Sequence, residues 1–327
     1  MKLWEKRLAS FFRTKAASFL LISGAAAMIV MSHDQGAAQV AILSSPHSIT
    51  ADPLSLIPPA ISGWINMAML VLVMLMLVYI NRRFNVMRSQ LTIYTGLFLL
   101  LTAANPPLSS TFTASTLLAI ALLYTMVLYY TVYNLRRQIR PVYLGAFVVG
   151  SVGLISYPAF LYIPVLLMML IQSRVFSLRS IAAVLFGALT PIWIAWGFGW
   201  LDTDLRLHFY LVNPRLLIST PEWTQLTITA AATLLIGFFT GFSVLLKVMT
   251  FNARSRMLNG MMTLLASFSG LFMIINYENI LLYMTILNAT VAFQTAYYLR
   301  LRKGRSGYLM VIFVILTSIT LYFRAVS

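Results

Sequence analysis

The sequence predicts an all-α protein, a polytopic transmembrane helical bundle of about eleven helices, with nine to eleven as the range. Of its 327 residues, 60% are hydrophobic and only 9% are charged, whereas roughly 25% of residues are charged in a soluble domain. Apolar segments recur along the whole chain, and the gaps between them alternate between base-rich and base-poor. No polar stretch is long enough for a separate soluble domain. Residues 1–327 are therefore treated as a single integral membrane domain.

Eleven segments are predicted to cross the membrane: residues 16–32, 61–80, 91–104, 116–133, 141–156, 159–172, 180–200, 224–246, 257–275, 280–298 and 306–323. The third, fifth and sixth are the shortest. At about 1.5 Å per residue they scarcely cover a hydrocarbon core of about 30 Å. Tyr157 and Pro158 lie between the fifth and sixth segments. These two segments therefore either span separately or form a re-entrant hairpin.

Charge asymmetry predicts the orientation of the bundle. Twenty of the 23 Lys and Arg residues fall on one side of the predicted segments, and six of the seven acids fall on the other. The base-poor side carries Arg206, Arg215, Arg324, Asp34, Asp52, Asp202, Asp204, Glu222 and Glu278. Because Lys and Arg are concentrated in cytoplasmic loops, the N-terminus is predicted to be cytoplasmic and the C-terminus external. Two external loops have appreciable length, residues 33–60 and 201–223.

The N-terminal region allows two interpretations. Five basic residues precede the apolar run 16–31, and Gly36-Ala37-Ala38 follows it, which is also the layout of a cleavable signal peptide. An uncleaved first helix is the preferred interpretation, because such helices are common in multispanning proteins.

Composition and motifs exclude several classes of function. The formal charge of +16 is scattered in short clusters at segment ends, so topology explains it and nucleic acid is not an expected partner. The chain has no Cys, which excludes disulfides and thiol chemistry. No P-loop or dinucleotide fingerprint occurs, and no cofactor is indicated. Protein partners are not indicated either.

Ion-coupled transport is disfavoured, because no Asp, Glu, Lys or Arg lies clearly inside a predicted helix. Four amides, Asn66, Asn259, Asn288 and Gln294, do lie inside helices. They either line a polar path or form hydrogen bonds between helices, and the second interpretation is preferred.

Asp34 is the candidate catalytic residue. It directly follows the first predicted helix, in Ser32-His33-Asp34-Gln35, and should lie at the external membrane boundary. A carboxylate there is suited to act as general base toward the headgroup of a lipid whose tail remains in the bilayer. The alternative is a solvated loop acid that follows the charge asymmetry. His33 and His47 lie in the same loop without a recognised ligand spacing, so no metal site is predicted.

The second external loop contains candidate substrate-binding residues: Asp202, Asp204, Arg206, His208 and Arg215. An Asp-x-Asp pair can hold a divalent cation, and Arg binds phosphate oxygens. Together they provide the groups needed to bind a phosphate-linked substrate. The alternative is local pairing, since Asp202 and Arg206 are four residues apart and would neutralise each other in a helix.

Two further patterns have structural explanations. Trp193, Trp196, Trp200 and Trp223 flank the second loop, as expected of an interfacial aromatic belt. Gly237 and Gly241 form a G-x-x-x-G pattern in the eighth predicted helix, which is typical of close helix packing.

Asn81-Arg82-Arg83-Phe84, the connector from Arg174 to Arg179, and the segment from Gly187 to Pro191 resemble an uncharacterised multispanning family of Bacteroides-type bacteria. The resemblance covers roughly residues 60–200. It implies a bacterial inner (plasma) membrane location and supplies no activity.

The long external loops after the first and seventh helices, with Asp34 closing the first helix, are similar in layout to the GT-C glycosyltransferases. The resemblance implies transfer of a sugar from a polyprenyl-phosphate-linked donor, with Asp34 as catalytic base. Gln35 stands where a second acid often follows in that superfamily, and the large soluble domain of many members is absent. Two alternatives stay open: a non-enzymatic carrier or flippase for a lipid or small solute, and a structural subunit of an envelope complex. A polar external cavity would favour the enzyme, a cavity at mid-depth the carrier, and an exposed apolar groove the subunit.

Overall fold

The computed structural model is all-helical. It describes residues 7, 10–12, 14–32, 54, 57–87, 92–135, 138–201, 221–248, 253–301 and 305–326. The helices within these ranges are α2 (Lys15–Met31), α4 (Pro59–Phe84), α5 (Ile93–Ala103), α6 (Pro106–Ser110), α7 (Ala114–Thr131), α8 (Arg140–Ile155), α9 (Ile163–Gln172), α10 (Leu178–Gly197), α12 (Pro221–Val248), α13 (Ala253–Ile275), α14 (Ile280–Leu301) and α15 (Arg305–Val326). Two 3-10 turns, η1 (Tyr157–Tyr162) and η2 (Tyr277–Asn279), lead into α9 and α14.

Each of the eleven predicted segments is helical, and seven of the helices are long and apolar enough to cross a bilayer. These seven are α4, α7, α10, α12, α13, α14 with its leading turn, and α15. Their number and hydropathy make the chain an integral membrane protein. The four shorter apolar helices are α2, α5, α8 and α9 with its leading turn. Three of them, α5, α8 and α9, correspond to the three shortest predicted segments.

The helix α14 is the centre of the bundle. Within the apolar stretch of α14 that is long enough to span a membrane, 94% of the residues are buried inside the protein. The helices α5, α7, α12 and α13 all pack against it. Around it, α2 packs on α5, where Ser18 Oγ lies 2.8 Å from Thr92 Oγ1, and α10 packs on α8.

The path of the chain is interrupted between α5 and α6. Asn105, Pro106 and Pro107 follow Ala104, the C-cap residue of α5. Proline lacks the N–H that would continue a helix, and it fits the first turn of a new one. The resulting α6 has only five residues, and every residue of α5 and α6 is buried. This short helix is absent from the sequence prediction, because five residues give no hydropathy signal.

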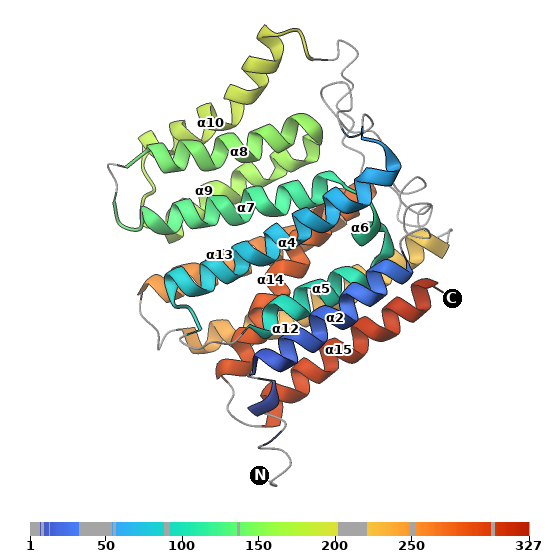
Figure 1. Cartoon of the computed structure of the whole chain (residues 1–327). Coiled ribbons are helices and arrows are strands. Elements are labelled where there is room, and N and C mark those ends of the chain that lie inside the picture. The colour runs from blue at the N-terminus through green and yellow to red at the C-terminus, as the bar shows by residue number, and fades with distance from the viewer. Residues whose placement is uncertain are drawn as a thin grey trace.

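Most basic residues of the described helices gather at one end of the bundle, called the basic end below, whereas Arg324 lies in the last turn of α15 at the other end. Those at the basic end include Lys15, Arg82, Arg83, Arg140, Arg179, Lys247, Arg254, Arg256 and Arg300. The helix ends that carry them lie along the left and lower side of Figure 1, and the ends of α2 and α15 and the start of α12 lie on the right. The described acids Glu222 and Glu278 are on the other end, in the first turn of α12 and in η2.

Candidate functional site

The predicted site residues all lie outside the described residues. Asp34 and its neighbour His33 follow the end of α2, and Asp202, Asp204, Arg206, His208 and Arg215 precede the start of α12; His47 is likewise outside. The structure does describe the points at which these two segments join the bundle, namely Ser32 on one side and Pro221 on the other.

These two points flank the same turn of α15. The Tyr322 hydroxyl donates a hydrogen bond to the Met28 carbonyl oxygen near the end of α2 (3.1 Å). The Gln225 side-chain amide donates to the Leu321 carbonyl oxygen from the first turns of α12 (2.8 Å). Leu321 and Tyr322 are neighbours in the chain, so α2 and α12 both contact the same turn of α15 at this end of the bundle.

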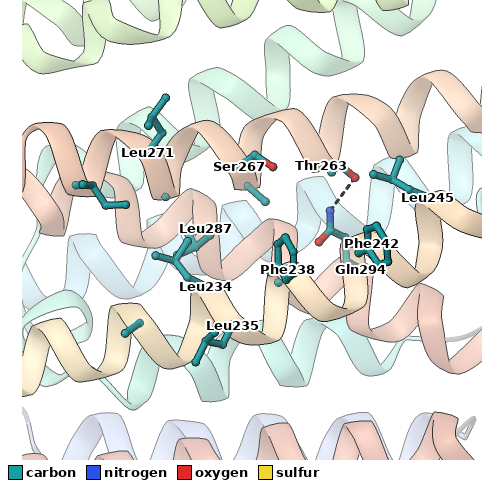
Figure 2. Close-up of a pocket in the computed structure, with 16 residues that line it drawn as sticks. Leu234, Leu235, Phe238, Phe242, Leu245, Thr263, Ser267, Leu271, Leu287 and Gln294 are labelled. Atoms are coloured by element: carbon teal, nitrogen blue, oxygen red, sulfur yellow. Dashed lines mark hydrogen bonds between the residues drawn. The ribbon is translucent and has the colours of Figure 1, made fainter.

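A groove runs between α12 and α13, with α14 as its floor. It has a volume of about 730 Å³, and Figure 2 shows side chains of all three helices around it. On α12 its lining extends from Ala231 to Leu245, a rise of about 21 Å. Most of the lining is aliphatic or aromatic, so the groove is suited to an elongated apolar ligand.

Glycines bring α12 and α13 close to their neighbours at the groove. A Cβ atom added at Gly237 would lie 2.6 Å from Val291 Cγ2 on α14, and one at Gly241 would lie 3.2 Å from Gln294 Oε1. A Cβ at Gly270 on α13 would lie 2.4 Å from Leu234 Cδ2 on α12. The G-x-x-x-G pattern therefore packs α12 onto α14 within the chain, as expected of close helix packing.

Polar groups interrupt the apolar wall at mid-depth. The Gln294 amide donates a hydrogen bond to Thr263 Oγ1 (3.2 Å), drawn as the dashed line in Figure 2. The Gln294 Oε1 atom is buried and has no hydrogen-bond partner among the described residues. Ser267 lies one turn from Thr263 on α13 and is exposed. The groove is thus lined by two hydroxyl groups and one amide side chain along a wall that is otherwise apolar.

The groove opens sideways, toward the surface that faces lipid. Leu235 and Phe238 on α12 are 70% and 75% exposed, and Ile274 on α13 is 72% exposed. All three belong to helices of membrane-spanning length. A ligand can therefore enter from the bilayer without crossing an aqueous phase.

The amides inside the helices make different contacts. Asn66 and Gln294 form the predicted hydrogen bonds between elements, whereas Asn259 donates to the Ser255 carbonyl oxygen of its own helix. Asn288 is buried, and neither polar atom of its side chain has a partner among the described residues. The prediction of interhelical hydrogen bonds is therefore confirmed for two of the four.

The groove was missed by the sequence analysis. Two signals in the sequence point to the groove in retrospect. Thr263 and Ser267 are four residues apart, and so are Gly237 and Gly241 on the facing helix.

Within the described ranges, no group of three or more His, Cys, Asp or Glu side chains could hold a metal ion. Comparison of the chain with protein-family models, curated proteins and solved structures finds no match.

Proposed function

We propose that this membrane protein acts on a long-chain lipid and holds the chain in the groove between α12 and α13. The observation that carries the proposal is a lateral groove of about 730 Å³ with an apolar wall and a polar layer at mid-depth. Lipid is the solvent around these helices, and an elongated chain fits a groove about 21 Å long.

The shape and lining of the groove favour a hydrocarbon chain as its occupant. The lining extends about 21 Å along α12 and is mostly aliphatic or aromatic. An unbranched or isoprenoid chain can therefore lie lengthwise in it.

The reaction we propose is transfer of a sugar from a lipid-linked donor at the external face. Asp34 takes the proton from the acceptor hydroxyl, the freed oxygen attacks the sugar, and the lipid phosphate leaves. Arg206 and Arg215 hold that phosphate, with Asp202, Asp204 and His208 beside them. The hydrogen bonds of Tyr322 and Gln225 support this proposal, because they hold the end of α2 and the start of α12 beside the same turn of α15.

The groove and the external segments are compatible in distance. Ala231, the lining residue of α12 nearest its start, is ten residues from Pro221, which is a rise of about 15 Å. A lipid with its chain in the groove can therefore present its phosphate at the start of α12, where the 201–223 segment joins.

A carrier is the second candidate, and the mid-depth polar layer favours it. Gln294 is seven residues from the end of α14, or about 10 Å below the basic end. Polar groups at this depth lower the cost of moving a headgroup through the membrane. In a carrier, the lipid changes leaflet and no sugar bond is broken.

Photolabelling tests the lipid site. A polyprenyl phosphate with a photoreactive group on its chain, incorporated into nanodiscs with the full-length protein, should label α12 and α13. Ser267→Trp fills the groove and should lower labelling about tenfold, equivalent to about 1.4 kcal/mol. Leu316→Trp, at an exposed position on α15, is the matched control and should label like the parent. Equal labelling of both variants would contradict the proposal.

Substitution at Asp34 tests the reaction separately from the lipid site. Asp34→Asn removes the base and should lower sugar transfer by about 10²–10⁴-fold, while groove labelling stays unchanged. Arg206→Ala and Arg215→Ala should raise the KM for the donor, because each removes a charge-assisted contact to phosphate. Full transfer activity in Asp34→Asn would exclude the base role, and lipid movement between leaflets without transfer would identify a carrier.

A further inference from the structure

The break between α5 and α6 lies near several buried polar side chains that have atoms without a hydrogen-bond partner among the described residues. Asn66, Asn105, Ser110 and Asn288 are at most 2% exposed. The atoms without a hydrogen-bond partner among the described residues are Asn66 Oδ1, Asn105 Nδ2, Ser110 Oγ, Thr111 Oγ1, Thr113 Oγ1, and both Oδ1 and Nδ2 of Asn288. Each such atom costs about 1–3 kcal/mol if nothing binds it.

Hydrogen bonds bring the helices that carry these atoms together. The Asn66 amide on α4 donates to the carbonyl oxygens of Leu108 and Ser109 on α6, at 3.0 Å each. The hydroxyl oxygens of Ser115 on α7 and Thr285 on α14 lie 2.6 Å apart. Asn288 follows Thr285 by three residues and so faces the same side of α14. The four helices therefore meet around α6.

We propose that a single monovalent cation, Na⁺ or K⁺, binds where α4, α6, α7 and α14 meet. Five of the seven unpartnered atoms are oxygens. The Asn105 amide can present oxygen by a rotation of its side chain, since amide oxygen and nitrogen are assigned from their contacts. Several neutral oxygens around a helix break are a recurring ligand set for such ions in membrane proteins.

The charge of the surroundings favours a monovalent ion over a divalent one. Ca²⁺ and Mg²⁺ sites rely on carboxylates, whereas the described acids, Glu222 and Glu278, lie in α12 and η2 rather than in these four helices. The carbonyl end of α5 precedes the break directly, and its partial negative charge favours a cation there. The proposed ion site and the groove use different faces of α14, because Asn288 is six residues, or about 120° around the helix, from Gln294.

Thermal unfolding in matched salts tests the ion site. The full-length protein in detergent micelles should unfold at a midpoint about 3 °C higher in NaCl or KCl than in N-methylglucamine chloride at equal ionic strength, and the rise should saturate with concentration. Asn288→Leu removes an oxygen ligand at similar volume and should abolish the rise. Thr102→Val is the matched control, because the Thr102 hydroxyl donates to Phe98 of its own helix, and it should keep the rise.

Asn288→Asp keeps the test decisive if Asn288→Leu does not fold. A carboxylate strengthens cation binding, so the midpoint difference between the inorganic and organic salts should increase. Equal midpoints in all three salts, an undiminished response in Asn288→Leu, or an unchanged response in Asn288→Asp would each overturn the proposal.

Discussion

At the scale of single residues, glycine decides how closely the helices approach. A Cβ at Gly150 on α8 would lie 2.5 Å from the Ala188 carbonyl oxygen on α10, and one at Gly187 would lie 2.5 Å from the Tyr143 carbonyl oxygen. Both contacts are with backbone, which cannot turn aside as a side chain can. The sequence shows where these glycines are, but only the packed helices show which of them touch a neighbour.

Alanine substitutions at Gly150 and Gly24 should therefore have different effects on the free energy of unfolding. Gly150→Ala forces α8 and α10 apart and should lower the free energy of unfolding by about 1–3 kcal/mol. Gly24→Ala in α2 meets nothing within 4 Å and should leave stability unchanged or raise it by about 0.5–1 kcal/mol. Thermal unfolding in detergent measures both. Equal effects of the two substitutions would show that this packing does not limit stability.

At the scale of elements, hydropathy was sufficient to find the helices. Each of the eleven predicted segments corresponds to a helix, because a backbone in lipid must satisfy its hydrogen bonds internally and helices are the local way to do so. The exception is the α5 region. A single crossing at 91–104 was predicted, whereas the structure has an 11-residue helix, a break at Asn105 and the five-residue α6. Two prolines after an asparagine were a local signal for that break.

The exposed aromatic end of α10 agrees with the belt predicted from sequence. Trp193, Trp196 and Trp200 are 75%, 67% and 60% exposed, and Pro191 precedes them inside the helix. Trp223 differs, because it stacks on Tyr277 with ring centroids 5.6 Å apart. Three of the four tryptophans are thus exposed at the surface, and the fourth stacks on another ring. Hydropathy alone does not distinguish these two environments.

At the scale of the whole molecule, the described basic residues other than Arg324 share one end of the bundle, as the alternating charge pattern predicts. The fold itself is compatible with either orientation in a membrane, and the positive-inside rule predicts the one with the basic end in the cytoplasm. In that orientation the C-terminal end of α15 would face outward.

Reporter fusions test that orientation. An alkaline phosphatase that is active only outside the cytoplasm should be active when fused after Thr113 or Thr220, and inactive after Gln138 or Asn252, because the flanking bases retain the latter segments inside. A fluorescent reporter that matures only in the cytoplasm should give the reciprocal pattern at the same four positions. Reversal at two or more positions would overturn the assigned topology.

By itself, the sequence determined that this is a helical membrane protein, where its helices lie and which end of each is basic. Hydropathy and charge are local properties that can be summed along the chain. Tertiary structure alone decided that Gly241 meets Gln294 and that Tyr322 and Gln225 bring α2 and α12 beside α15. It also decided that Asn288 is buried without a hydrogen-bond partner among the residues that the structure describes. Such contacts join residues far apart in the chain. In lipid they depend on how closely the helix surfaces fit, because lipid tails are as apolar as the side chains and hydrophobicity does not select one helix face over another.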